Sequence, residues 1–128
     1  MDTKRIGVDI DLTIFSFPLF FKDFFDAFQS KGVKVGIVTA NHQDKKSKYL
    51  DTLEKIGIVP DFFIGVPEDN NNSAGTFKGK VCKDLKIDVM VDDFHNNDPK
   101  MLADFFAVNH KTIPLTAFGY KNLIHLEK

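Results

Sequence analysis

The sequence predicts an α/β fold of three layers, in which a parallel sheet is covered by helices on both faces. Short, almost continuously apolar runs recur along the chain, separated by segments whose apolar residues follow helical spacing. Strands that are buried on both faces read as continuous apolar runs, and helical crossovers between them make the sheet parallel. The 128 residues are therefore expected to form one Rossmann-like domain over residues 1–128.

The N-terminal half of the chain predicts two strands, each followed by a helix. Residues 5–10 read as the first strand, and residues 12–17 as a short irregular or hairpin-like segment. Residues 18–31 read as a helix, because phenylalanines recur at helical spacing and charged side chains occupy the other face. Residues 33–39 then predict the second strand and residues 43–56 the second helix.

The C-terminal half continues the alternation with shorter elements. The expected order is a strand at 62–66, a helix at 78–85, a strand at 87–92, a helix at 99–104 and a strand at 105–108. Residues 111–128 give no clear pattern.

The composition indicates a soluble globular protein of ordinary charge. Hydrophobic residues make up 43% of the chain and charged residues 27%, and the net charge of -1 does not predict a general nucleic-acid or anionic-membrane surface. The single cysteine, Cys82, excludes an internal disulfide and fits a reducing, cytoplasmic compartment. Asp9 and Asp11 interrupt the N-terminal apolar run, so we expect neither a signal peptide nor a membrane span.

Two acids follow the first apolar run, in the pattern Asp-x-Asp-x-Thr formed by Asp9, Asp11 and Thr13. If the strand continued regularly, Asp9 and Asp11 would project the same way. Two carboxylates at the exit of a buried strand are costly unless a cation or a hydrogen-bond donor compensates them. The pair is therefore a candidate functional site, with an Asx-type turn or a helix cap as the alternative.

Polar residues also follow two later strands. Thr39 closes the second strand, and Asp92 and Asp93 close the strand at 87–92. In parallel sheets, ligands bind at the carboxyl ends of the strands near the point where the strand order reverses, so these side chains should converge with Asp9. The alternative is that the acid pair caps a helix and that Thr39 is an ordinary strand-end residue.

The ordered set resembles the haloacid dehalogenase-like (HAD) superfamily of phosphohydrolases. Asp-x-Asp-x-Thr, then Thr39, then a lysine, then Asp92 occur in the order of the four family motifs and span residues 6–98. The resemblance implies a HAD-like core and Mg²⁺-dependent hydrolysis of a phosphate monoester through an aspartyl-phosphate. Lys78 fits the spacing of the family lysine best, and Lys80 is the alternative.

The resemblance also implies a role for each matching residue. Asp9 matches the nucleophile and a metal ligand. Asp11 matches the general acid/base, and its backbone carbonyl a further metal ligand, as in the phosphatase branch of the family. Thr39 matches the hydroxyl that binds the transferring phosphoryl group, helped by backbone N–H groups near Ala40 and Asn41.

The remaining roles concern the metal and the support of the substrate. Asp92 matches an acidic metal ligand, and Asp93 a second ligand or a residue that supports one, with Asp98 a weaker candidate for the latter. Thr13 would support the turn by local hydrogen bonding. Together with Ala40, Asn41 and Lys80, it completes the residues expected around the substrate.

The spacing of the motifs leaves no room for a cap domain. Residues 13–35 hold little beyond one helix, and residues 41–78 hold one helix, one strand and one loop. A capless HAD-like site is open, which suits a phosphorylated macromolecule, such as a nucleic-acid end or a phosphoprotein. The other readings are closure by a second subunit of a homo-oligomer and a nucleotide or sugar phosphate bound at the subunit interface.

Other functions fit parts of the pattern. A nucleotidase, a polynucleotide-end phosphatase or a phosphotransferase would use the same aspartyl-phosphate, and a non-catalytic binding module would keep only the fold. A receiver domain would place its phosphorylated aspartate after the third strand, where this chain has Gly65-Val66-Pro67 instead.

Overall fold

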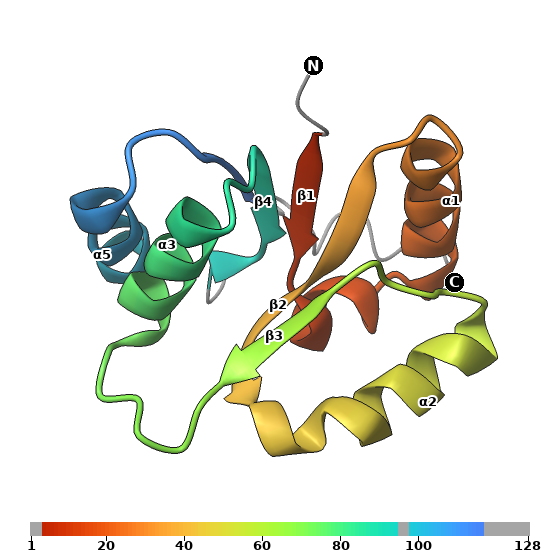
Figure 1. Cartoon of the computed structure of the whole chain (residues 1–128), viewed down its shortest axis with the longest axis horizontal. Helices are drawn as coiled ribbons and strands as arrows, with labels where there is room; N and C mark the ends of the chain where they lie inside the picture. Colours follow the sequence, from red (N-terminus) through yellow and green to blue (C-terminus); the bar gives the residue numbers. More distant parts are fainter. Residues whose placement is uncertain (1–3, 95–97, 117–128) are drawn as a thin grey trace.

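The computed structural model describes residues 4–94 and 98–116 and confirms the predicted three-layer α/β fold (Figure 1). All four strand pairs of the five-stranded sheet are parallel, and the strand order is β3-β2-β1-β4-β5. The strands are β1 (Arg5–Val8), β2 (Lys34–His42), β3 (Phe63–Val66), β4 (Val89–Asp92) and β5 (Ile113–Thr116). The main helices are α1 (Pro18–Gln29), α2 (Lys46–Ile56), α3 (Ala74–Asp84) and α5 (Pro99–Val108).

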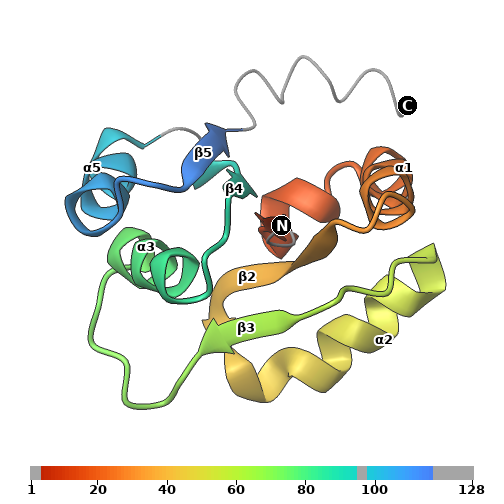
Figure 2. The same ribbon diagram turned by 45° about the horizontal axis from the view of Figure 1, so that its top comes forward.

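Helices cover both faces of the sheet, and alternate strand residues point into the two resulting cores. Helices α1 and α2 lie on one face, and α3 and α5 on the other (Figure 2). Val35 and Ile37 of β2 join the first core with Phe25 of α1, whereas Val38 joins Met90 in the second core. This alternation explains why the strands read as continuous apolar runs in the sequence.

The strand order reverses beside β1, which places a crevice at the carboxyl ends of β1 and β4. The chain moves outward from β1 through β2 to β3 and then returns to β4 on the other side of β1. Val8 is in register with Ile37 of β2 and with Val91 of β4. The crossover loops therefore diverge above β1, the usual position of a ligand site in such a sheet.

The close approach of α3 to α5 depends on two glycines. A Cβ atom on Gly75 would collide with the backbone carbonyl of Met101, and one on Gly79 would lie 2.9 Å from the carbonyl oxygen of Phe105. Lys78 precedes Gly79 on α3, and only 2% of it is exposed. Tight packing of α3 therefore holds this lysine under the crevice.

Several predicted boundaries move, and two of the shifts affect the site. The first strand ends at Val8 rather than at residue 10, and residues 10–14 form a short helical turn in which Leu12 has a left-handed backbone (φ +60°). Helix α3 begins at Ala74, four residues earlier than predicted, because the Ser73 side chain caps it by accepting a hydrogen bond from the Thr76 N–H. Lys78 consequently lies in the second turn of the helix.

The prediction of a strand at residues 105–108 is wrong, because these residues form the last turns of α5. Met101 and Phe105 are both buried and lie one helical turn apart, so helical burial overrides the strand-like run of apolar residues. The fifth strand is β5, within the segment to which the sequence assigned no element, and residues 117–128 lie outside the described residues.

No cap domain is present between the described strands. The connection from β1 to β2 holds the turn at 10–14 and α1, and the connection from β2 to α3 holds a turn at Gln43–Lys45, α2 and β3. Within residues 4–94 and 98–116, no helix combines the length and apolar character needed to cross a membrane.

Candidate active site

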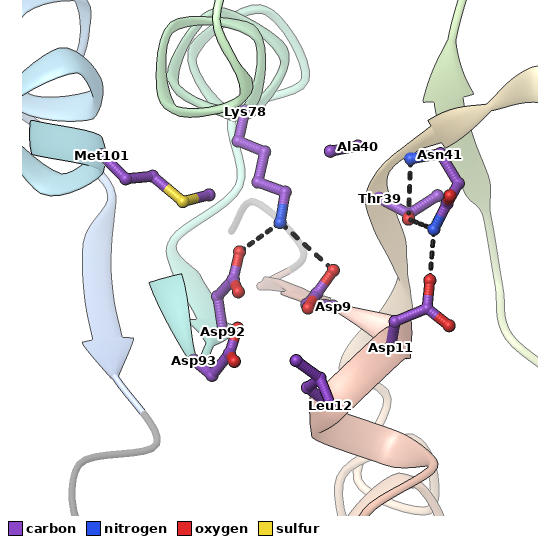
Figure 3. A pocket seen from close by; sticks show the side chains of 10 residues that line it. All are labelled: Asp9, Asp11, Leu12, Thr39, Ala40, Asn41, Lys78, Asp92, Asp93 and Met101. Atoms are coloured by element: carbon purple, nitrogen blue, oxygen red, sulfur yellow. Dashed lines mark hydrogen bonds and ion pairs between the residues drawn. The ribbon is translucent and has the colours of Figure 1, made fainter. Parts of the chain in front are cut away.

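A hollow of about 210 Å³ lies at the carboxyl ends of β1, β2 and β4, where the strand order predicts a ligand site (Figure 3). Its lining residues are Asp9, Asp11, Leu12, Thr39, Ala40, Asn41, Lys78, Asp92, Asp93 and Met101. Eight of these ten positions belong to the set predicted from the sequence; Leu12 and Met101 are the additions. Segments far apart in the chain thus converge on one site.

Lys78 links the first and last acidic motifs at the base of the hollow. Its Nζ atom donates a hydrogen bond to Asp9 Oδ1 at 3.1 Å and another to Asp92 Oδ2 (Figure 3). All three side chains are less than a tenth exposed. Buried charges of this kind are tolerated only when they are paired, so each group depends on the other two.

Backbone and side-chain donors fix the orientation of the two carboxylates. The Thr13 hydroxyl donates to Asp9 Oδ2 at 3.3 Å, and the backbone N–H of Phe94 donates to Asp92 Oδ1 at 2.9 Å. The Asp9 N–H donates to the Val91 carbonyl at 2.8 Å, which ties the end of β1 to β4. Asp9 and Asp92 are therefore held rigidly toward Lys78.

Burial and neighbouring charges shift the pKa values of this cluster. Burial raises the pKa of Asp9 to about 7; Lys78 opposes the rise, and Asp92 adds to it. For Lys78, burial lowers the pKa, but the charges of Asp9 and Asp92 outweigh it, so the pKa lies above its usual value. Lys78 therefore stays charged, while Asp9 holds a proton more readily than an exposed aspartate.

The acidic residues also suit a divalent cation. Asp9, Asp92 and Asp93 are buried, and each offers one carboxylate oxygen within 4.8 Å of the others. Lys78 is the only cation among the residues that line the hollow, so it balances one of these negative charges. Mg²⁺ prefers oxygen ligands and is commonly held by one or two carboxylates, so the donor set fits the ion expected from the sequence.

A pH-dependent stability should follow from the shifted pKa of Asp9. Between about pH 4 and about pH 7, the folded protein keeps a proton on Asp9 that the unfolded chain has lost, so stability falls as the pH rises through this range. Asp9→Asn removes this titration. The free energy of unfolding is measured by urea in the presence of chelator at about pH 5 and about pH 8. Between these two pH values it should fall less in the variant than in the wild type. An equal fall in both proteins would contradict the raised pKa of Asp9.

Asp11 occupies the opposite side of the hollow, apart from the Lys78 cluster. Its Oδ2 atom accepts hydrogen bonds from Asn41 Nδ2 and, at 3.1 Å, from the Tyr49 hydroxyl (Figure 3). The condition under which Asp9 and Asp11 would project the same way is not met, because the regular strand ends at Val8. Asp9 lies at the base of the hollow, and Asp11 is half-buried.

Thr39 and its neighbours form the wall on the side of β2. The Thr39 hydroxyl accepts a hydrogen bond from the backbone N–H of Asn41 at 3.1 Å, and Thr39 is buried. Strand β2 continues to His42, so Thr39 lies within the strand and not at its end as predicted. An irregularity in the pairing with β3 falls between Val38 and His42, at the point where this wall forms.

Three predicted residues lie outside the lining of the hollow. Thr13 is fully buried behind Asp9 and supports its carboxylate, so it is not exposed to a substrate. Lys80 is exposed and donates to Asn72 Oδ1 at 3.4 Å. Asp98 caps α5 through the Lys100 N–H at 2.9 Å. Of the two candidate lysines, Lys78 alone reaches the acids.

The contact between Tyr49 and Asp11 is not predicted from the sequence. The helical spacing of Tyr49 on α2 predicted a core residue, and its ring does pack between Phe15 and Phe63, with ring centroids 6.1 Å away on each side. Its hydroxyl nevertheless reaches Asp11. Burial, followed by the charge of Asp11, raises the pKa of Tyr49 to about 12, so the hydroxyl remains a donor. A tyrosine that packs its ring into a core generally keeps a polar partner for its hydroxyl, which is the one available sequence signal.

Comparison of the chain with protein-family models, with curated proteins and with solved structures finds no match.

Proposed function

We propose that this protein is a Mg²⁺-dependent phosphatase that hydrolyses a phosphate monoester through an aspartyl-phosphate on Asp9. One observation carries the proposal. Lys78 pairs with Asp9 and Asp92 at the base of a hollow in which Asp93 supplies a third nearby carboxylate. A buried nucleophile, a fixed cation and an oxygen-rich metal site are the parts that phosphoryl transfer requires.

Asp9 is the residue placed to attack phosphorus. Lys78 and Thr13 each bind one of its oxygens, so the carboxylate is held in a single orientation. Its attack would form the acyl-phosphate bond and release the alkoxide leaving group. Water would then break the acyl-phosphate bond and regenerate Asp9 with release of inorganic phosphate.

The metal would be held by the carboxylates of Asp9, Asp92 and Asp93, with the backbone carbonyl of Asp11 as the further ligand that the HAD resemblance implies. When bound, Mg²⁺ supplies positive charge that favours ionised Asp9 and neutralises phosphate oxygens. Lys78 adds a fixed positive charge between Asp9 and Asp92. Thr39 presents a hydroxyl on the opposite wall, where it would donate to a phosphate oxygen.

Asp11 would act as the general acid and then as the general base. It is half-buried and lies on the far side of the hollow from the Lys78 cluster (Figure 3). A leaving group in line with Asp9 departs away from the base of the hollow, toward the side where Asp11 can give it a proton. The same carboxylate can then take a proton from the attacking water.

Asp11→Asn tests this role. The amide keeps the shape of the side chain but cannot transfer the proton, so turnover should fall by a factor of about 10²–10⁴. Mg²⁺ affinity, measured by calorimetry, should remain largely unchanged, because the three carboxylates of the cluster are intact. Normal turnover in the variant would contradict the assignment of Asp11 as acid/base.

Hydrolysis of a generic aryl phosphate tests the proposed function as a whole. The wild type should release phosphate with Mg²⁺ and stop in excess chelator. A phosphatase should release equal amounts of the phenol and of inorganic phosphate, and added alcohols should not change this ratio. A phosphotransferase would instead release less phosphate than phenol when an alcohol acceptor is present. Failure to bind Mg²⁺ together with failure to hydrolyse the ester would favour a non-catalytic binding module.

We place this activity in the cytoplasm, on a phosphorylated substrate that an uncapped site can admit. The hollow of about 210 Å³ is smaller than the roughly 300–1,000 Å³ of a typical small-molecule pocket, so a large substrate would extend beyond it. Leu12 is 57% exposed where it lines the hollow, and offers such a substrate an apolar contact. A polynucleotide end, a phosphoprotein and a nucleotide at a homo-oligomer interface all fit this description.

A further inference from the structure

The Asp11 carboxylate is held by two donors from different elements, and both end on the same oxygen. Asn41 of β2 donates through Nδ2, and Tyr49 of α2 donates through its hydroxyl at 3.1 Å; each hydrogen bond is accepted by Oδ2. A proton can therefore sit on Oδ1 without breaking either bond. This arrangement fixes the carboxyl group and leaves one defined oxygen for proton transfer.

We propose that Tyr49 is a positioning residue for proton transfer by Asp11: together with Asn41, its hydroxyl fixes the orientation of the Asp11 carboxyl group on the β2 side of the hollow. The inference rests on the proposed function and adds to it a residue that none of the sequence motifs contains. Tyr49 does not line the hollow, so it acts through Asp11 and not on the substrate.

The packing of Tyr49 makes it suited to this task. Its ring is stacked on Phe63 of β3, with 27° between the ring planes, and also packs against Phe15, which follows the turn that carries Asp11. The ring is thus held between the sheet and the segment after β1. A side chain fixed in this way loses little entropy when its hydroxyl orients a neighbour.

Asp11 needs hydrogen-bond donors to fix its side chain, because the local backbone conformation does not fix it. Residues 11 and 12 leave helical geometry, with Asp11 in an extended conformation and Leu12 in the left-handed region. The side chain leaves this irregular turn half-buried, so many rotamers would be open to it without a partner. The hydrogen bonds from Asn41 and Tyr49 select one of them.

The test compares Tyr49→Phe with the wild type on two esters. A simple alkyl phosphate needs a proton on its leaving group, whereas 4-nitrophenyl phosphate has a leaving group that departs without one. We expect kcat/KM, which reports the steps up to departure of the leaving group, to fall about tenfold on the alkyl ester and to change less than about twofold on the nitrophenyl ester. The ring packing is retained, so the variant should fold normally.

Two controls separate positioning from a general loss of structure. Thr52→Val removes another hydroxyl from α2, one that donates to the Lys48 carbonyl at 3.1 Å on the exposed side, and should change neither rate. In an Asp11→Asn background, Tyr49→Phe should have no further effect on the alkyl ester, because the group that it positions can no longer transfer a proton.

The outcomes distinguish this inference from the proposed function. Equal losses of kcat/KM on both esters, no loss on either, or an additive loss in the Asp11→Asn background would overturn the positioning role while leaving the phosphatase assignment intact. Absence of Mg²⁺-dependent hydrolysis of both esters by the wild type would overturn the proposed function, and the role of Tyr49 with it.

Discussion

Asp9→Asn is expected to lower Mg²⁺-dependent phosphate release by a factor of about 10³ or more. The amide cannot form the aspartyl-phosphate, and it also removes one of the three clustered carboxylates. Initial rates on an aryl phosphate, measured at saturating Mg²⁺, check the prediction. The side chain is only 9% exposed, so the effect is local to the base of the hollow.

Asp23→Asn is the matched control for Asp9→Asn, because it makes the same chemical change at an exposed position of α1. It should leave the rate unchanged. Asp9→Asn protein that remains folded but retains more than about a tenth of the wild-type rate would show that Asp9 is not the nucleophile.

Lys78→Ala is expected to have the largest effect on stability. It leaves Asp9 and Asp92 buried side by side without their cation, which should cost about 3–5 kcal/mol in the free energy of unfolding. Urea unfolding in chelator measures this loss. Turnover should also fall, because the charge that orients Asp9 and balances the phosphoryl group is gone.

Lys80→Ala is the control for Lys78→Ala, two residues along the same helix. Lys80 is exposed and touches Asn72, so its loss should change the free energy of unfolding by less than about 0.5 kcal/mol. Added Mg²⁺ should reduce the loss of unfolding free energy in Lys78→Ala, since the ion supplies positive charge to the same carboxylates. A larger loss of activity in Lys80→Ala would transfer the role to Lys80.

The order of strands and helices is predictable from the sequence up to β4, because burial on both faces makes each strand a short apolar run. Beyond that point the same signal fails. The run at residues 105–108 is too short to distinguish a strand from a buried helical turn, and the turn continues the spacing set by Met101. Strand β5 contains Pro114 and lies at the edge of the sheet, so its sequence shows little strand character.

The residues of the candidate site are predictable to the extent that they follow strands. Asp9 directly follows β1 and Asp92 ends the adjacent strand β4, so parallel pairing alone brings them together. Spacing alone favoured Lys78 but kept Lys80 as an alternative. In the structure Lys78 is buried against Asp9 and Asp92, whereas Lys80 is exposed and contacts Asn72. Tyr49 was missed because its contact with Asp11 spans 38 residues and joins helix α2 to an irregular turn.

Trapping of a phosphorylated enzyme is the decisive test of Asp9 as the nucleophile. The wild type is mixed with an aryl phosphate and Mg²⁺, quenched in acid during turnover and digested for mass spectrometry. We expect a phosphoryl group on the peptide that contains Asp9, and none in chelator. Asp11→Asn should accumulate more of it if hydrolysis of the aspartyl-phosphate slows more than its formation. Turnover without a phosphoryl group on Asp9, or with one on another residue, would show that Asp9 is not the nucleophile.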